Sequence, residues 1–312
     1  KQKLKLLCII HLIFYLYKQK NFCLISILEC SPIAIFSKFF IFRKSIFVTR
    51  VCNTLSPYLS SKKNIINYYY QYLLNLITLK FSDKIIVQNL NMKIDLENLY
   101  SFIKYKNLHI LNNSLDTEKI FELSKIHYKT PINTKDKINF ITICTLREQK
   151  NLFLMIDIFK LINTKYPDTF LFIVGDGVLK EQLNKYIKVN GLDNNIHITG
   201  LETNPYKILV QSQYYLSTSN YEGTSNSILE ALFMGLPVIA IKCPSGIEEL
   251  ISNETNGYLV DGKNVKKNFF SVISDILDKK ITFEKKEKIK SLINNNYNLE
   301  STYNVFNKII NE

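Results

Sequence analysis

Short apolar runs that alternate with longer, mixed segments are the feature that most constrains the fold of this 312-residue chain. Four early runs, FCLISILE, SIFVTRV, DKIIVQN and NLHILNN, each have a mainly apolar centre. Such runs are typical of parallel strands that are buried on both faces of a sheet. Segments of helical character lie between them: PIAIFSKFFIF, residues 63–80 and residues 90–104. This alternation predicts βαβ units and a parallel sheet.

A second alternating series begins after a polar stretch, residues 124–137, which is the candidate linker. We expect its strands at 138–146, 169–175, 195–200, 214–219, PVIAIK and GYLV, and its helices near 151–165, 178–190 and 203–212, in the helix after residue 223, and in three closing segments. A single core stops growing near roughly 250–300 residues. We therefore predict an α/β chain of two doubly wound domains, residues 1–130 and 131–312, whose last helix can cross back to the first domain.

The cysteines and histidines show no metal-binding pattern. Neither type forms a Cys-x-x-Cys pair or any comparable ligand spacing in the sequence: Cys at 8, 23, 30, 52, 144 and 243, His at 11, 109, 127 and 197. We expect free thiols in a reducing compartment and no metal. The uncharged stretch from Leu6 to Tyr17 is shorter than the ~20 residues of a membrane-spanning helix, and it lacks a signal-peptide cleavage site. It predicts a buried or interfacial helix.

The positive charge of the chain is confined to its first part. Residues 1–135 contain 20 Lys and Arg against 7 Asp and Glu, whereas residues 136–312 contain 20 against 20. An excess of this kind favours an anionic surface beside the first domain, either a bilayer or a nucleic acid. The alternative is compositional drift in a chain rich in Lys, Asn and Ile. Nucleic acid is the weaker partner, because no recognition module is present.

The stretch NYEGTSNSILEALFMGLPVIA, residues 220–240, carries the strongest chemical signal. Glu222 and Gly223 follow a predicted strand and would lie at the carboxyl edge of the parallel sheet, where open α/β proteins bind ligands. Free amides at the start of the following helix would favour a phosphate group. Glu230, inside that helix, could accept hydrogen bonds from a ribose. The alternative is a capping box, Ser227 with Glu230 three residues later.

Two other loops could reach the same edge. CTLREQKN, residues 144–151, places Arg147 and Lys150 directly after the first strand of the second domain, where cations could neutralise a leaving diphosphate. VGDG, residues 174–177, is a glycine-containing turn after the next strand. Taken alone, the first loop could be solvated surface and the second an ordinary turn.

In this order, the segments ITICTLREQKN, LFIVGDGVLKEQLNKYI, IHITG, SNYEGTSNSILEALFMGLPVIA, SGIEELI and NGYLV resemble the retaining glycosyltransferases of family 4. They cover nearly all of residues 138–262. The resemblance implies the GT-B fold of two facing Rossmann-like domains, the first on the acceptor side and the second binding the nucleotide-sugar donor. It also implies that the first domain is incomplete here and that the chain lacks its start.

The resemblance implies roles for particular residues. Glu222 and Lys150 would be catalytic, Glu222 beside the donor sugar and Lys150 on the donor diphosphate. The donor-binding residues would be Thr145, Arg147, Gly175, Gly177, Gly223, Thr224, Ser225, Asn226 and Glu230. Two positions depart from the family pattern. Cys144-Thr145-Leu146 stands where Gly-Arg-Leu is usual, so that Arg147 would have to substitute, and Cys52 stands where many relatives carry a His.

The activity implied is transfer of a hexose or N-acetylhexosamine from a nucleotide-diphosphate sugar, with retention, to a hydroxyl of a glycan or a lipid-linked, lipopolysaccharide-type acceptor. The nucleotide sugar is the donor substrate, and we expect no cofactor. We expect a cytoplasmic protein, peripheral at the inner face of the cytoplasmic membrane, that takes part in surface polysaccharide assembly. The alternative is a truncated, inactive donor-binding remnant or partner subunit.

Overall fold

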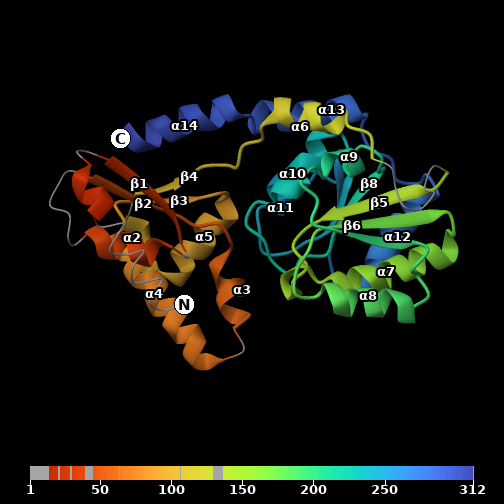
Figure 1. The fold of residues 1–312 in the computed structure, drawn as a ribbon, viewed down its shortest axis with the longest axis horizontal. Coiled ribbons are helices and arrows are strands. Elements are labelled where there is room, and N and C mark those ends of the chain that lie inside the picture. Colours follow the sequence, from red (N-terminus) through yellow and green to blue (C-terminus); the bar gives the residue numbers. More distant parts are fainter. Residues whose placement is uncertain are drawn as a thin grey trace. The chain divides into compact units, whose positions relative to one another are not determined.

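The computed structural model describes residues 14–19, 22–28, 30–38, 45–62, 64–105, 107–128 and 136–311. The chain divides into two compact units, shown in Figure 1. Unit 1 contains Lys1–Asn112 and Lys308–Glu312, and unit 2 contains Asn113–Asn307. The C-terminal helix α14 (Leu299–Asn311) begins in unit 2, and its last residues belong to unit 1. Within unit 1, the buried Lys84 ammonium donates a hydrogen bond to the Ile309 carbonyl at 2.6 Å.

Unit 1 is built on a parallel sheet of four strands in the order β1-β2-β3-β4. The strands are β1 (Phe22–Ile27), β2 (Ser45–Arg50), β3 (Lys84–Val87) and β4 (Leu108–Ile110). The helices are α2 (Ser31–Lys38), α3 (Leu55–Ser60), α4 (Ile65–Phe81) and α5 (Leu90–Leu99), followed by the 3-10 helix Ser101–Tyr105. All four predicted strands are confirmed. The apolar side chains of β3 and β4 pack with α4 and α5 around Leu79, Ile85 and Leu96, whereas those of β1 and β2 pack with α2 around Phe47.

Unit 2 contains a parallel sheet of six strands in the order β10-β9-β8-β5-β6-β7. The strands are β5 (Ile138–Ile143), β6 (Thr169–Val174), β7 (Ile196–Gly200), β8 (Tyr214–Ser217), β9 (Val238–Ile241) and β10 (Gly257–Val260). From β5 the chain adds β6 and β7 on one side, then returns to add β8, β9 and β10 on the other. The strand order therefore reverses between β5 and β8, and such a switch point is where doubly wound sheets bind ligands.

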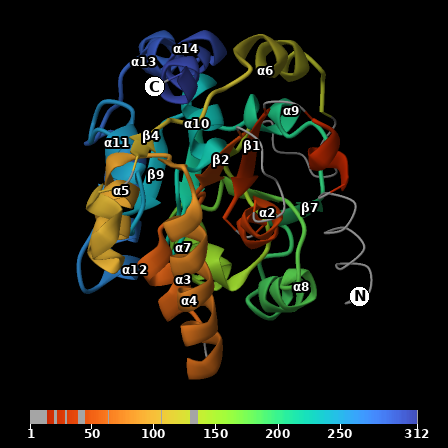
Figure 2. The ribbon, with the colours of Figure 1, turned by 90° about the vertical axis from the view of Figure 1, so that its left-hand side faces the viewer.

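Helices cover both faces of the six-stranded sheet, as Figures 1 and 2 show. Adjacent strand residues point to opposite faces, so Phe140 packs with α7 (Leu152–Lys165), α8 (Lys180–Val189) and α12 (Val265–Leu277). Ile141 instead packs with α9 (Tyr206–Leu209), α10 (Asn226–Phe233), α11 (Ile247–Leu250) and α13 (Lys286–Asn296). Two buried layers result, which explains why the strands are mostly apolar.

Several local predictions differ from the structure. The helix expected over 203–212 covers only Tyr206–Leu209, and the helix expected over 90–104 ends at Leu99. The short helices α3, α11 and α6 (Thr117–Ser124) were not predicted. α6 begins where Asp116 accepts a hydrogen bond from the Lys119 amide at 3.1 Å, although the surrounding pattern is polar. Four to eight residues present too little periodicity to be recognised.

Parts of several predicted segments lie outside the described residues, among them residues 39–42 of the predicted helix PIAIFSKFFIF. Residues 14–18 are helical, and the rest of the apolar stretch before them is not described. The predicted linker is described only at 124–128 and 136–137. Within the described ranges, no helix is both long and apolar enough to cross a bilayer.

Candidate functional site

The loops after β5 and β8 meet at the switch point of unit 2. Lys150 ends the 3-10 helix Glu148–Lys150 that follows β5, and Glu222 lies in the loop after β8. Their side chains form an ion pair between Lys150 Nζ and Glu222 Oε1. The Ser219 hydroxyl donates to the same carboxylate oxygen at 2.7 Å. Glu222 is only 8% exposed, so a carboxylate is buried here with two donors directed at it.

Hydrogen bonds join these two loops along their length. The Thr218 hydroxyl donates to the Lys150 carbonyl at 3.0 Å, and the Asn220 amide donates to the Gln149 carbonyl at 2.8 Å. The Gln149 side-chain amide donates a hydrogen bond to the Tyr221 carbonyl, also at 2.8 Å. The contacts tie 149–151 to 218–222 and therefore fix where the ion pair lies.

A third loop, after β9, completes the site. The Glu222 amide donates to the Pro244 carbonyl at 3.2 Å, and the Gly246 amide donates to the Gly223 carbonyl at 3.1 Å. A small pocket opens between the strand ends and the start of α10, lined by Thr142, Ile143, Cys144, Lys150, Met155, Tyr215, Ser217, Thr218, Ser219, Glu222, Ser225 and Ser227. Burial raises the pKa of the Cys144 thiol to about 11, which keeps it protonated despite the opposing effect of the Lys150 charge.

The helix α10 begins at Asn226, with Ser225 as its N-cap residue. Ser227 therefore lies inside the helix, where its hydroxyl bonds to the Tyr215 hydroxyl at 2.8 Å. The capping-box alternative for Ser227 and Glu230 is wrong, because the helix starts earlier than that pattern requires. The Ser225 side chain makes no capping bond, so the first amides of α10 are not occupied by it.

Asn113 supports the start of α10, and the sequence analysis did not identify it. Its amide nitrogen donates to the Thr224 carbonyl at 3.1 Å and to Asn226 Oδ1 at 2.6 Å. The partners are more than 100 positions away in the chain, and no local pattern indicates them. Thr224 and Asn226 are thus held by Asn113, the first residue of unit 2.

Glu230 lies one turn further along α10, and its carboxylate faces a different helix. The Tyr206 hydroxyl of α9 donates to Glu230 Oε1 at 3.2 Å. Burial raises the pKa of the Glu230 carboxyl to about 6, and the Tyr206 hydrogen bond opposes part of that rise. Glu230 does not line the pocket that contains Lys150 and Glu222. The structure thus brings Lys150 and Glu222 together, whereas Glu230 lies on α10, the short helix that borders their pocket.

Gly175 and Gly177 lie where the loop after β6 packs against the loop after β5. A Cβ on Gly175, whose φ is +145°, would stand 1.9 Å from the Cys144 carbonyl oxygen. A Cβ on Gly177 would stand 2.5 Å from the Leu146 carbonyl oxygen. Both glycines are therefore explained by close backbone packing, and a direct donor contact stays a prediction.

Thr145 and Arg147 are exposed on the same loop as Lys150. The Arg147 carbonyl accepts a hydrogen bond from the Lys150 amide at 3.0 Å, which forms the short turn that positions the lysine. Within the described ranges, no group of three or more His, Cys, Asp and Glu side chains is arranged to hold a metal ion. Lys150 and Glu222 thus carry the charges of the pocket, and the exposed side chain of Arg147 lies on the same loop as Lys150.

The family model described as glycosyl transferases group 1 matches residues 124–298, more than half of the chain. An uncharacterized glycosyltransferase of Methanocaldococcus jannaschii is 36% identical over 200 residues, 64% of this chain and 47% of the relative. The poly(ribitol-phosphate) alpha-N-acetylglucosaminyltransferase of Staphylococcus aureus is 29% identical over 235 residues, 73% of this chain and 47% of the relative. The chain spans about half the length of these curated relatives.

The solved structure of Anabaena HepE in complex with UDP-glucose superimposes with a TM-score of 0.80 at 15% sequence identity. The match covers 97% of this chain and 81% of that chain. Together with the two parallel sheets, this likeness shows the GT-B fold that the sequence predicts.

Proposed function

The chain belongs to the glycosyl transferases group 1, and from this premise we propose that it moves a hexose or N-acetylhexosamine from a nucleotide-diphosphate sugar to a hydroxyl group. We propose further that it belongs to family 4 and retains the configuration of the anomeric carbon. The observation that carries the proposal is the buried pair of Lys150 and Glu222 at the switch point of unit 2. A cation beside the start of α10 suits a diphosphate, and a buried carboxylate next to it suits the hydroxyls of a sugar.

Different residues of the site would bind different parts of the donor. Lys150 and the first amides of α10, near Gly223 to Asn226, would hold the diphosphate and stabilise the charge that develops as it leaves. Glu222 would accept hydrogen bonds from the transferred sugar. Glu230 would accept them from the ribose in place of the bond it now receives from Tyr206. Arg147 would supply a second cation, without a metal ion.

Donor binding would exchange the partners of the ion pair. The diphosphate would take Lys150 from Glu222, and the freed carboxylate oxygen would turn to the sugar while keeping its bond from Ser219. No buried charge would be left unpaired during such an exchange, which limits its cost.

The acceptor would belong to a surface polysaccharide and reside at an anionic membrane. The positive charge of residues 1–135 supports this, because each basic residue near such a surface contributes about 1 kcal/mol. The helix α4 also carries an exposed apolar stripe, has no acidic residue and has Lys80 in its last turn. Residues four apart share a helix face, which defines the α4 stripe as Ile65, Ile66, Tyr69, Tyr70, Leu73, Ile77 and Phe81.

Thermal unfolding with a panel of nucleotides and nucleotide sugars tests the donor site. We expect UDP or another nucleoside diphosphate, and its sugar form, to raise the unfolding temperature of the full chain. The shift should be lost in Glu230→Ala and retained in Glu181→Ala, a control at an exposed position on α8. A shift that is equal in all three proteins would remove Glu230 from the ribose role.

Co-sedimentation with vesicles tests the membrane proposal. We expect binding to phosphatidylglycerol vesicles that weakens with salt, and little binding to phosphatidylcholine vesicles. Leu73→Glu in the α4 stripe should abolish it, whereas Val189→Glu, at an exposed apolar position of unit 2, should not. If Leu73→Glu binds the vesicles as well as the parent does, or if the substitution only disrupts a dimer of the chain, the α4 stripe does not contact lipid.

An inactive donor-binding protein or partner subunit is the second candidate. Cys52 and Thr145 stand at positions where the family resemblance implies other residues, and the chain spans about half of its relatives. Hydrolysis or transfer of a nucleotide sugar by the chain would exclude this candidate. Donor binding without turnover would favour it.

A further inference from the structure

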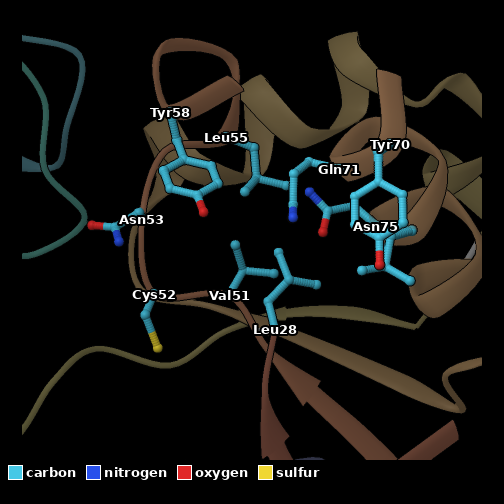
Figure 3. A pocket seen from close by; sticks show the side chains of 10 residues that line it. Leu28, Val51, Cys52, Asn53, Leu55, Tyr58, Tyr70, Gln71 and Asn75 are labelled. Atoms are coloured by element: carbon cyan, nitrogen blue, oxygen red, sulfur yellow. The ribbon is translucent and has the colours of Figure 1, made fainter. Parts of the chain in front are cut away.

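The space at the carboxyl ends of the strands is filled differently in the two units. In unit 1, Leu28 follows β1 and Val51 follows β2, and both border a cavity of about 330 Å³, shown in Figure 3. In unit 2, the pocket at the switch point encloses only about 10 Å³. Tyr215 of β8, which is 2% exposed, lines this pocket and reaches across to the end of β5.

The Tyr215 hydroxyl joins three groups. Its oxygen lies 3.2 Å from the Ile143 amide nitrogen, 3.1 Å from the Ile143 carbonyl oxygen and 2.8 Å from Ser227 Oγ. A phenol has one hydrogen and two acceptor lone pairs, so it can bond to all three neighbours at once. Burial raises the pKa of the Tyr215 hydroxyl, which keeps it protonated and able to donate.

The Tyr215 bonds form where β5 and β8 diverge. The ladder between these strands pairs Phe140 with Tyr214 and Ile141 with Tyr215. Ile143 lies two residues beyond that ladder, at the end of β5, and its amide and carbonyl both meet the Tyr215 hydroxyl. Backbone groups that are shielded from water need partners. The hydroxyl therefore takes the place of the strand that has turned away.

Through Ser227, Tyr215 also contacts the start of α10. Ser227 Oγ lies 3.2 Å from the hydroxyl oxygen of Ser225, the N-cap residue of that helix. An N-cap serine normally accepts a hydrogen bond from the second or third helical amide, but Ser225 makes no such bond. The contact with Ser227 thus holds the Ser225 hydroxyl away from the first amides of α10, and these amides stay open to an anion.

The groups that suit a diphosphate come from two different strands. Lys150 belongs to the loop after β5, whereas the first amides of α10 follow β8. A diphosphate that bonds to both needs a fixed spacing between them, because charge-assisted hydrogen bonds are short and directional. Tyr215 links the end of β5 to the first turn of α10 and thereby sets this spacing.

We propose that Tyr215 is a positioning residue for the donor, whose hydroxyl holds the α10 amides at the distance from the Lys150 loop that a diphosphate spans. Tyr215 acts from beneath the site and does not touch the donor. It acts through Ile143 on one side and through Ser227 and Ser225 on the other. The inference rests on the proposed function, since the spacing matters only if a diphosphate binds here.

Titration of the full chain with nucleoside diphosphates and the matching nucleosides tests the inference. The pairs are UDP with uridine, ADP with adenosine and GDP with guanosine. Calorimetry measures the diphosphates, saturation-transfer NMR measures the weaker nucleosides, and the parent protein identifies the pair that binds most tightly. Tyr215→Phe keeps the ring and loses only the hydroxyl. It should raise the Kd of the diphosphate about fivefold, the equivalent of one hydrogen bond, and leave the Kd of the nucleoside unchanged.

Tyr214→Phe is the matched control. It removes the same hydroxyl from the opposite face of β8, where the Tyr214 ring stacks on Phe140, and it should bind the diphosphate as the parent does. Ser227→Ala should weaken the diphosphate as Tyr215→Phe does. The double variant should be no weaker than either single variant, because both substitutions break one chain of bonds. Circular dichroism melts show which variants are folded, and Ser227→Ala suffices if Tyr215→Phe does not fold.

The outcomes separate this inference from the proposed function. If the parent binds a nucleoside diphosphate and the Tyr215→Phe and Ser227→Ala variants bind it as tightly, Tyr215 does not position the donor. Equal weakening of the diphosphate and the nucleoside, or an equal effect of Tyr214→Phe, would reduce Tyr215 to a role in stability and overturn the inference. If the parent binds none of the three diphosphates, the proposed function fails, and this inference fails with it.

Discussion

Replacing Glu230 by Gln should stabilise the protein at neutral pH while it weakens donor binding. The pKa of the Glu230 carboxyl is raised from 4.5 to about 6 by burial. A raised carboxyl pKa means that the folded state binds the proton more tightly than the unfolded state. The resulting stability is complete below pH 4.5 and is lost as the pH rises through 6. At 1.36 kcal/mol for each pKa unit, the ionised carboxylate costs about 2 kcal/mol at pH 7.

Urea unfolding of the parent and of Glu230→Gln at pH 5 and pH 7.5 measures this cost. Gln keeps the shape and cannot ionise, so the difference in unfolding free energy between the two proteins should grow by about 1 kcal/mol between these pH values. Taking the difference cancels the titration of all other groups, and Glu181→Gln serves as the exposed control. An unchanged difference, or one that grows toward low pH, would refute the assigned burial of Glu230.

Two other substitutions test the geometry of the site. Lys150→Met should lower the unfolding free energy by about 3 kcal/mol in urea unfolding. This is the lower end of the range for a broken buried ion pair, because the two side chains keep 16% and 10% exposure. The double variant with Glu222→Gln should recover part of the loss, and additive losses would contradict the pairing. Gly175→Ala should lower the unfolding free energy by about 2 kcal/mol or more, since its Cβ would meet the Cys144 carbonyl oxygen 1.9 Å away. Gly191 has open space around it and a φ of +66°, so Gly191→Ala should lower the unfolding free energy by only about 1 kcal/mol. Equal losses would argue against the close packing of Gly175.

The sequence was informative wherever structure depends on residues near one another in the chain. The centre of DKIIVQN, Ile85 to Val87, is apolar because both faces of a parallel strand are covered, and β3 lies within that run. The loop with Glu222 follows β8 directly, so its place at the carboxyl edge needed only the strand to be recognised. The helix that includes Glu230 was predicted because the residues that form it are neighbours in the chain.

The features that the sequence did not reveal depend on residues far apart. The pairing of β8 with β5, rather than with β7, creates the switch point, and nothing in either strand specifies its neighbour. The start of α3 is held by Asp95 of another helix, and the side chain of its N-cap residue Thr54 makes no capping bond there. The same is true of Glu230, whose hydrogen-bond donor Tyr206 lies 24 positions earlier on a helix of one turn.

The ion pair of Lys150 and Glu222 also limits how a donor could be recognised. A diphosphate that entered beside an intact, electrically neutral pair would bring uncompensated negative charge into a poorly solvated pocket, which is unfavourable. Lys150 would therefore leave Glu222, and the carboxylate would gain donor hydroxyls while it keeps its bond from Ser219. A free diphosphate lacks those hydroxyls, whereas a nucleotide sugar supplies them on the transferred ring. Under the proposed function, the pair thus favours the complete donor over its product, because only the donor gives both charges a new partner.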